Sequence, residues 1–521
     1  MTVDASFPAQ IIKRMAVEKL EGKLPGVFSM KNVMMSITHS HSAPGGTETG
    51  MPGIFGLGVV RASVNAVVDG VFRAILQAHN NTEPAATKLT IGSLEGASIN
   101  RSPTAYLKNP ESERKNYSLD YDERFLQLNI VSESTGNLTG LLNWFAVHPN
   151  SLDVTNKLVS GDNKGYAAYD VERHFNGIDK PPGMGPFVAG FASSNLGDLS
   201  PQTKGAKCQR GPGEGQPCSN RSTCPSKWST KFLPLGDPTL CWGLGPESDS
   251  GTCYGSNRVI GTMQSDKAIE LTNATSQTQL TGKIDFRHSY VLFPEVEVPN
   301  PESEESKSKP KKIKLCWPAM GMSFAAGSSD GTGTKIFTYT QGAHSPISFN
   351  PVFQSVIQPF ITHGIGKIVS QPTWEDKACQ GVKPILGQFG SKKGGKQKPI
   401  QMYPAIVPVQ IFRVGCFFIL SCAAEPTTMA GRRIRKQVKQ VIIENLPEGE
   451  CDEVHVTIAG LANSYSGYIT TREEYQLQRF VRGFGVGDDY GRWQVGALGC
   501  IVLFFVRFLM CTLLVAWSVA C

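Results

Sequence analysis

The chain has 521 residues, of which 40% are hydrophobic and 18% charged, a composition typical of a globular protein. Its formal net charge of +7 is modest for this length, and much of it lies in two lysine-rich runs, 307–314 and 392–398. Neither run contains the interleaved aromatic residues on which nucleic-acid binders stack bases, so both are predicted to be solvated loops and no nucleic-acid partner is expected.

The N-terminal part predicts helices and a strand in alternation. Apolar residues at helical spacing indicate a helix that contains Ile12, Met15, Ala16 and Leu20, and alternation over 32–38 indicates a strand. After a glycine-rich turn, apolar residues at helical spacing between 60 and 75 indicate a long amphipathic helix. This order of elements is typical of a layered α/β domain.

The C-terminal part predicts a hairpin, a helix and a strand, and it also contains a polar stretch and a long apolar segment. The elements are a hairpin of 405–412 and 416–420, a helix over 434–442 and a strand over 454–459. The polar stretch 299–314 is predicted to be an inserted surface loop. From 495 to 521 the chain is apolar except for Arg507, which is long enough to span a bilayer.

The cysteines predict an oxidising compartment. Five of the 13 lie in the Gly/Pro/Ser-rich region 208–253, without a CxxC spacing or a nearby histidine, so a disulfide-stapled loop is favoured over a zinc knuckle. Sequons agree with a secreted glycoprotein; they are at Asn80, Asn116, Asn137, Asn220 and Asn273. Residues 1–20 contain no signal peptide, so we expect a preceding segment to be missing from this sequence.

Histidines and one glutamate mark candidate chemistry. His39 and His41 leave the predicted strand for a Gly/Pro turn, where a metal or catalytic role is favoured over two ordinary loop histidines. His148 ends another apolar run, and taken alone it is better interpreted as a satisfied buried histidine. Glu425 ends a third run, where it could simply stabilise a helix N-terminus. Together they suit a hydrolytic zinc site, which needs a few N/O ligands and an open position.

Collinear motifs between residues 3 and 479 resemble those of the neutral ceramidases. The first four are THSHSAPGG at 38–46, NRSPTAYL at 100–107, WFAVHP at 144–149 and SGDNKGYA at 160–167. The later four are FASSNLGDLSP at 191–201, SFAAG at 323–327, EPTTMAGRR at 425–433 and YITT at 468–471. So many separate matches in one order are very specific.

The resemblance implies an α/β fold, a layered single catalytic domain with a mixed sheet and flanking helices that is truncated at both ends. This neutral ceramidase catalytic domain, incomplete, would cover residues 1–482. Residues 483–521 would be an unmatched tail that contains the apolar segment 495–521. We expect no functional transmembrane anchor there, because the family's chain is still forming its catalytic domain where the resemblance stops.

The resemblance also implies a site. Carried over by motif, the zinc ligands would be His39, His148, Glu425 and Tyr468. The catalytic candidates would be His41 and Arg101, which would hold the polar head of the substrate and the developing oxyanion, together with Ser200. Ser200 could be a nucleophile or could only position groups near the metal. We favour a zinc-bound water as the attacking group, because zinc lowers the pKa of water to about 7 and polarises the amide carbonyl.

The implied function is a zinc-dependent amidohydrolase that cleaves the amide bond of ceramide (N-acylsphingosine) to sphingosine and a free fatty acid. Its partners would be ceramide and membrane-surface lipid, in the secretory pathway or outside the cell, with membrane association left open. One alternative is an inactive or regulatory lipid-binding paralogue, because Phe480 stands where the family has a tyrosine. The other is a zinc amidase on a soluble amide. The implied disulfides are Cys208–Cys224, Cys218–Cys241 and Cys316–Cys379, with Cys253 unmatched.

Overall fold

The structure of the chain is a computed structural model, and it describes most of the residues up to 477. The described residues are 1–48, 58–153, 155–218, 224–225, 240–248, 253–299, 312–317, 319–321, 374, 379, 385–388, 392–393, 396–397, 404–475 and 477. Phe480, the motif at 323–327 and the segment 495–521 lie outside them. Within the described residues, no helix is both long and apolar enough to cross a bilayer.

Two mixed sheets form the centre of the described fold. One has the strand order β11-β3-β5-β6-β7 and the other the order β12-β19-β20-β22. Neighbouring strands are antiparallel except for β6 with β7 and β20 with β22, which are parallel. The strands are β3 (Ala85–Ser93), β5 (Arg124–Ser132), β6 (Leu138–Phe145), β7 (Val188–Ser193), β11 (Thr278–Leu280), β12 (Ile284–Leu292), β19 (Ile406–Val414), β20 (Phe417–Ser421) and β22 (His455–Ala459).

Helices and short strand pairs surround the two sheets. The longer helices are α1 (Gln10–Lys23), α3 (Arg61–Asn80), α6 (Asp162–Asn176), α7 (Cys253–Thr272) and α11 (Thr428–Asn445), and the short ones are α4 (Pro103–Tyr106), α5 (Glu111–Arg114), α12 (Arg472–Tyr475) and the 3-10 turn Phe293–Glu295. Three short pairs carry candidate site residues: β1 (Thr2–Val3) with β2 (Ser36–Ile37), β4 (Ile99–Asn100) with β8 (Leu199–Ser200), and β21 (Glu425–Pro426) with β23 (Tyr468–Ile469). The others are β9 (Gly205–Cys208) with β10 (Cys241–Leu244), β13 (Glu297–Pro299) with β14 (Lys312–Lys314), β15 (Ala319–Gly321) with β16 (Ile385–Gln388), and β17 (Lys392–Lys393) with β18 (Lys396–Gln397).

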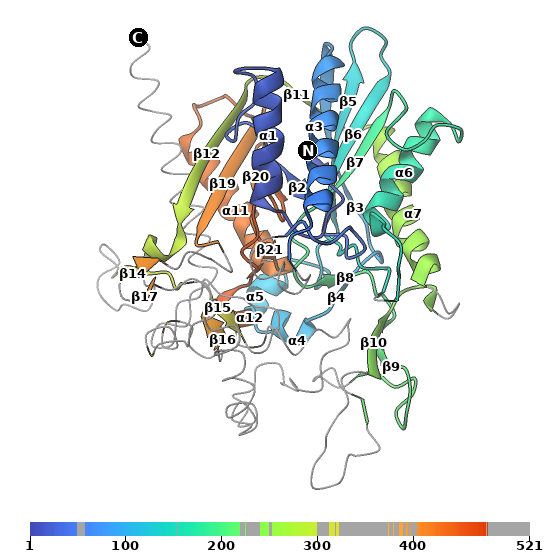
Figure 1. The fold of residues 1–521 in the computed structure, drawn as a ribbon, viewed down its shortest axis with the longest axis vertical. Coiled ribbons are helices and arrows are strands. Elements are labelled where there is room, and N and C mark those ends of the chain that lie inside the picture. Colours follow the sequence, from blue (N-terminus) through green and yellow to red (C-terminus); the bar gives the residue numbers. More distant parts are fainter. Residues whose placement is uncertain are drawn as a thin grey trace.

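Alternating side chains along the strands explain why the sheets stack. In β5, Phe125 clusters with apolar residues of α6 and α7, whereas its neighbour Leu126 clusters with residues of the other sheet. In β20, Phe417 faces the first sheet and Phe418 clusters with α11. The rings of Trp144 in β6 and Phe417 lie 5.6 Å apart. The expected layered α/β fold is therefore confirmed, as two sheets packed face to face between layers of helices (Figure 1).

The predicted helices are confirmed, and their apolar faces explain where they pack. Ile12 and Ala16 of α1 form one cluster with Val64 and Val68 of α3, and the two helices stand next to each other in Figure 1. The predicted C-terminal hairpin is also confirmed as β19 and β20. The predicted strand over 32–38 is wrong in extent, because only β2 forms there. Side chains at both odd and even positions of this segment are buried, so it has no exposed face.

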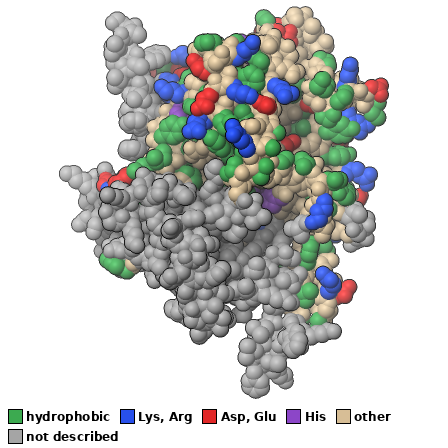
Figure 2. Space-filling model, viewed as in Figure 1, with side chains coloured by type: hydrophobic (Ala, Val, Ile, Leu, Met, Phe, Trp, Pro, Cys, Tyr) green, Lys and Arg blue, Asp and Glu red, His purple; other side chains and the backbone are tan. Residues whose placement is uncertain are grey.

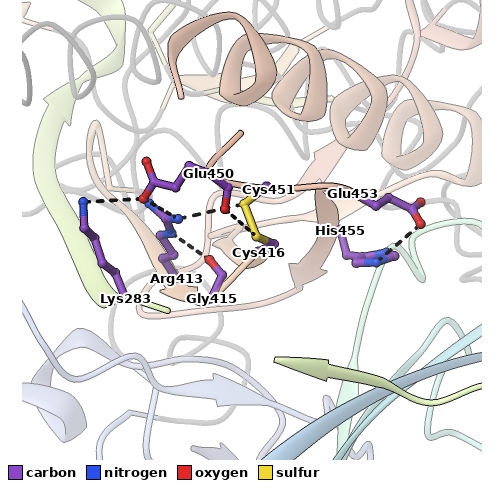
Figure 3. The surroundings of a disulfide bond; sticks show 8 residues. All are labelled: Lys283, Arg413, Gly415, Cys416, Glu450, Cys451, Glu453 and His455. Atoms are coloured by element: carbon purple, nitrogen blue, oxygen red, sulfur yellow. Dashed lines mark hydrogen bonds and ion pairs between the residues drawn. A yellow bond between two sulfur atoms is a disulfide. The ribbon is translucent and has the colours of Figure 1, made fainter. Parts of the chain in front are cut away.

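All three implied disulfides are present, and a fourth was not predicted. Cys208–Cys224, Cys218–Cys241 and Cys316–Cys379 have Cα–Cα distances of 5.6, 5.8 and 5.7 Å. The fourth, Cys416–Cys451, joins the turn before β20 to the loop before β22, with a Cα–Cα distance of 5.7 Å. Figure 3 shows it beside the ion pair of Arg413 with Glu450, whose charged atoms lie 2.8 Å apart. Cys253 forms no disulfide.

Figure 2 shows how the charged side chains of the described residues are distributed over one face of the molecule. Lysine and arginine side chains are scattered there among acidic and hydrophobic ones, rather than gathered in one basic patch. The expected surface loop 299–314 begins and ends in the antiparallel pair of β13 and β14, and its middle, 300–311, lies outside the described residues.

Candidate active site

The predicted site residues meet where the parallel strand pairs end. The N–H of Gly460, after β22, donates to the carbonyl of Ser193 at the end of β7 at 2.9 Å. The N–H of Gly197, in the loop after β7, donates to the carbonyl of Pro426 in β21, also at 2.9 Å. The carboxyl ends of both pairs are thus joined, which is where ligands bind in many α/β proteins. In Figure 1, β4, β8 and β21 lie at this end of the sheets.

The approach of Gly197 to β21 leaves no space for a side chain. A Cβ atom on Gly197 would lie 2.6 Å from the carbonyl oxygen of Glu425. The glycine of the sequence SSNLGDLS therefore allows the loop after β7 to lie directly against the segment that carries Glu425. The loop after β7 of the first sheet therefore lies against Glu425, which follows β20 of the second sheet.

His39 and His41 lie in the turn after β2. His39 is buried and has a φ of 71°, a left-handed conformation that costs a non-glycine residue of order 1–3 kcal/mol. Its ring Nδ1 is hydrogen-bonded to the carbonyl of Ser6. His41 is exposed, its N–H donates to the carbonyl of Pro149 at 3.1 Å, and its Nε2 lies 3.3 Å from Nε2 of His39. The turn thus brings both Nε2 atoms to one place.

His148 follows β6 and is fully buried. Its Nδ1 is 2.8 Å from the carbonyl oxygen of Leu199. A carbonyl oxygen can only accept, so the Nδ1 atoms of His148 and His39 carry the proton and each Nε2 presents a lone pair. Both histidines are therefore held in the tautomer that metal-binding histidines use, because a backbone carbonyl accepts from each Nδ1–H.

Glu425 faces both of these lone pairs from a position with no solvent exposure. Its Oε1 accepts a hydrogen bond from the Tyr465 hydroxyl at 2.5 Å and lies 3.6 Å from Nε2 of His39. Its Oε2 lies 3.1 Å from Nε2 of His148 and has no hydrogen-bond donor among the described residues. Two acceptor atoms that face each other without a proton between them are the arrangement that a bound cation stabilises.

The electrostatics of the three groups agree with this arrangement. Burial lowers the pKa of His39 and of His148 to about 4, although Glu425 opposes both shifts. Burial alone would raise the pKa of Glu425, but the two imidazoles and the Tyr465 hydroxyl hold it well below its usual range. At neutral pH the site therefore presents two neutral imidazoles and one carboxylate, which is the protonation state that metal binding requires.

Arg101 and Tyr468 complete the group. The Nη2 atom of Arg101 lies 3.2 Å from Nε2 of His148 and donates to the Tyr468 hydroxyl at 3.3 Å and to the carbonyl of Gly197 at 2.9 Å. Tyr468 is placed by the parallel pairing of β23 with β21, in which it stands opposite Glu425. The structure thus brings six of the seven predicted site residues into direct contact or pairing with one another.

Ser200, the seventh, lies close to this group without joining it. It is fully buried in β8, one residue after the Leu199 carbonyl that holds His148. Its hydroxyl oxygen accepts from the N–H of Gln202 at 3.2 Å. In the part of the chain that the structure describes, no imidazole or carboxylate is hydrogen-bonded to this hydroxyl.

Two further residues of the site were missed by the sequence analysis. Tyr465, which donates to Glu425, precedes Tyr468 by three residues in a stretch without periodicity, so nothing in the sequence marked it. Asp198 belongs to the quoted motif at 191–201, and its Oδ1 accepts from the N–H and hydroxyl of Thr428 at 2.7 and 2.8 Å. Its backbone carbonyl accepts from the N–H of Arg101 at 2.7 Å, which fixes that arginine. Burial raises the pKa of Asp198 to about 7.

The geometry fits a metal ion. Ligand atoms of His39, His41 and His148 lie within 4.8 Å of one another, so these three residues could hold one. A tetrahedral site with metal–ligand distances of about 2.0–2.1 Å has ligand–ligand separations of about 3.3 Å. The separations of 3.3, 3.6 and 3.1 Å among His39, His41, His148 and Glu425 are close to that value.

The family follows from comparison with known proteins. The sequence model described as "Neutral/alkaline non-lysosomal ceramidase, N-terminal" matches residues 1–498. The chain belongs to this family. The motifs at 38–46, 144–149 and 425–433, which carry the buried histidines and Glu425, lie within the matched region of the ceramidase family model.

Relatives and solved structures agree. Neutral ceramidase A of Dictyostelium discoideum is 37% identical over 500 residues, which cover 95% of this chain and 63% of that protein. A solved structure described as "Ceramidase complexed with C2" is 30% identical, with a TM-score of 0.71, and the match covers 96% of this chain and 65% of that one. The neutral ceramidase from Pseudomonas aeruginosa is 28% identical, with a TM-score of 0.69 over 98% of this chain and 66% of that one. This chain therefore spans slightly less than two thirds of the length of these ceramidases.

Proposed function

We propose that this chain carries the active site of a zinc-dependent amidohydrolase that cleaves the amide bond of ceramide to sphingosine and a fatty acid. The observation that carries the proposal is the meeting of two imidazole lone pairs with an ionised, buried carboxylate. His39 and His148 face Glu425 at 3.6 and 3.1 Å. Membership of the ceramidase family supports ceramide as the substrate.

We further propose that His39, His148, Glu425 and Tyr468 hold the zinc ion. When bound, zinc supplies a Lewis acid that polarises the amide carbonyl and acidifies water. Arg101 is placed to stabilise the negative charge that develops on the carbonyl oxygen, because its guanidinium is already fixed beside His148 and Tyr468. His41 is the exposed imidazole of the group, which suits a role in orienting the polar head of the substrate.

Turnover by the purified, zinc-loaded protein tests the proposed activity. The substrate is an N-acylsphingosine with a fluorescent label on its acyl chain, presented in detergent micelles. We expect release of the labelled fatty acid, and loss of this release after dialysis against a chelator. Bound zinc without turnover of any amide would show an inactive, lipid-binding relative. Turnover of a soluble N-acyl amide without turnover of ceramide would show a zinc amidase of another specificity.

The pH dependence of zinc binding tests the histidine ligands. Because burial lowers the pKa of His39 and His148 to about 4, protons compete with zinc for these atoms only near that pH. We therefore expect the histidine-dependent loss of zinc affinity as the pH falls towards about 4, and not near 6.5, the usual value for histidine. Competition with a chromophoric chelator across this range measures it, and Tyr468→Phe separates any contribution of the phenol. A step in affinity near pH 6.5 would contradict the assignment.

Ser200→Ala distinguishes the two candidate attacking groups. We expect zinc content to be unchanged and turnover to stay within about tenfold, because the Ser200 hydroxyl accepts from the N–H of Gln202 and is bonded to no described base. A nucleophilic serine would instead lose about 10⁴-fold or more. Ser193→Ala is a matched control, because this fully buried serine donates to the carbonyl of Thr38 at 2.7 Å. Loss of turnover in Ser200→Ala alone would make Ser200 the nucleophile.

We also propose that the protein is a glycoprotein that passes through the secretory pathway. Four disulfides support an oxidising compartment. The described sequon asparagines are all exposed, at Asn80, Asn116, Asn137 and Asn273, and Asn220 lies outside the described residues. Peptide mapping of the native protein without reduction would remove this support if it found the eight cysteines as thiols.

A further inference from the structure

Helix α6 begins with three consecutive polar residues that are buried. Asp162, Asn163 and Lys164 have 1, 0 and 0% exposure. They belong to the motif SGDNKGYA, to which the family resemblance assigned no role. Polar side chains in such positions cost stability unless they are fully hydrogen-bonded, so the groups that they bind identify what they do.

Asp162 and Asn163 hold the segment that carries His148. The two carboxylate oxygens of Asp162 accept from the backbone N–H groups of Ser151 and Leu152 at 3.0 and 2.9 Å. The side-chain amide of Asn163 donates to the carbonyl of His148 itself and to the Ser151 hydroxyl, both at 3.0 Å. The backbone at His148 and just after it is therefore fixed by the first turn of α6.

Lys164 holds the strand ends that lead into the site. Its Nζ donates to the carbonyl of Phe145, the last residue of β6, at 3.0 Å and to the carbonyl of Ala192 in β7 at 3.2 Å. Beyond these carbonyls the two strands diverge, one to His148 and the other to Leu199. These continuations meet again in the 2.8 Å contact between Nδ1 of His148 and the Leu199 carbonyl. Lys164 thus ties the two strands together on one side of these continuations, and the hydrogen bond of His148 ties them together on the other.

Asp4 is the acidic residue that opposes the effect of burial on Lys164, and burial also raises the pKa of Asp4. Burial lowers the pKa of Lys164 to about 7, and the nearby Asp4 carboxylate opposes the shift. Asp4 lies directly on the start of α6, because a Cβ atom on Gly161 or Gly165 would be 2.5 or 3.1 Å from its Oδ2. The two glycines of the motif therefore make room for the carboxylate that accompanies Lys164.

We propose that Asp162, Asn163 and Lys164 are positioning residues that set the direction of the His148 Nε2 lone pair toward Glu425. This inference rests on the proposed zinc site and adds to it the group that orients one ligand. It differs from a role in stability alone, because the three side chains bind the backbone before, at and after His148. Loss of any one should shift that imidazole relative to Glu425 while the other ligands remain.

Zinc affinity and the visible spectrum of the cobalt-substituted protein test the proposal. We expect Asn163→Asp and Lys164→Met to weaken zinc binding by about 10–100-fold, as changes behind a metal ligand do, and to alter the cobalt d–d bands. Asp162→Asn is a milder, nearly isosteric variant that decides the matter if Lys164→Met does not fold. Thermal unfolding of the metal-free proteins measures the loss of stability separately.

Glu172→Gln is the matched control, because Glu172 lies on the same helix and fixes backbone at its other end. Its carboxylate accepts from the N–H groups of Gly183 and Ala189 at 2.6 and 3.1 Å. We expect this variant to lose stability but to keep zinc affinity within about twofold. If the wild-type protein binds zinc and all three positioning variants keep its zinc affinity and its cobalt spectrum, this inference alone is overturned. A wild-type protein that binds neither metal would overturn the zinc site and this inference together.

Discussion

Glu425→Gln is expected to abolish zinc binding while leaving the metal-free protein folded. In the metal-free state, Oε2 of Glu425 and the lone pair of His148 face each other at 3.1 Å, and Oε2 has no donor among the described residues. A glutamine can keep its oxygen toward the Tyr465 hydroxyl, which donates to Oε1 at 2.5 Å. Its NH₂ group would then face Nε2 of His148, which also lies 3.2 Å from Nη2 of Arg101, so a donor replaces the carboxylate oxygen that opposes this nitrogen.

Zinc content and metal-free stability are the two measurements. We expect zinc to fall from about one ion per chain to a small fraction of that, because an uncharged amide replaces a carboxylate ligand. Turnover should fall by more than the about 10–100-fold that changes behind a ligand cause. Glu450→Gln is the control, since it removes a carboxylate that pairs with Arg413 at the far end of β20 (Figure 3). A Glu425→Gln protein that keeps one zinc per chain would exclude Glu425 as a ligand.

Arg101→Met is expected to give the opposite pattern, with zinc kept and turnover lost. Arg101 is a cation whose Nη2 lies 3.2 Å from Nε2 of His148, so its removal takes no ligand away and removes a charge that repels a metal ion. Turnover should fall by about 10²–10³, the usual effect of losing one donor to a developing oxyanion. The loss should appear in kcat more than in KM, because the interaction strengthens only as charge develops.

Arg413→Met controls for the loss of a partly buried arginine that is remote from the site. Arg413 pairs with Glu450 at 2.8 Å and is 14% exposed. Arg101→Met also leaves the carbonyl of Gly197 without this donor, which we expect to cost about 1–3 kcal/mol of stability. Assays therefore belong well below the unfolding temperature of the variant. Loss of zinc in Arg101→Met, or unchanged turnover, would contradict the assigned role.

The site was predictable from sequence where a strand end and a motif coincide. His39, His148 and Glu425 each follow an apolar run, and such runs end where loops build sites. Sequence reasoning could not supply Tyr465, because its hydrogen bond to Glu425 depends on how the chain between β22 and β23 returns to the site. The backbone acceptors at Ser6 and Leu199 were equally out of reach, because any residue offers a carbonyl.

The fold was predictable where contacts are local. Helices α1, α3 and α11 and the hairpin of β19 and β20 depend on periodicity within one segment. The stacking of the two sheets depends on residues as far apart in sequence as Trp144 and Phe417, and no pattern in either segment indicates the partner. Cys416–Cys451 was missed for the same reason, since 35 residues and a helix separate its cysteines.

That disulfide turns the crossover from β20 through α11 to β22 into a covalent ring. Cys416 precedes β20 and Cys451 precedes β22, so the amino ends of the two parallel strands are tied while their carboxyl ends lead to Glu425 and Tyr468. Closing a ring of 35 residues removes unfolded-state entropy worth roughly 4 kcal/mol at 25 °C in the loop-entropy estimate. A protease that cuts once inside α11 would leave both strands in one molecule until a reductant is added. After such a cut, the two halves of this crossover stay covalently joined through Cys416–Cys451. A reducing compartment such as the cytosol would break that bond.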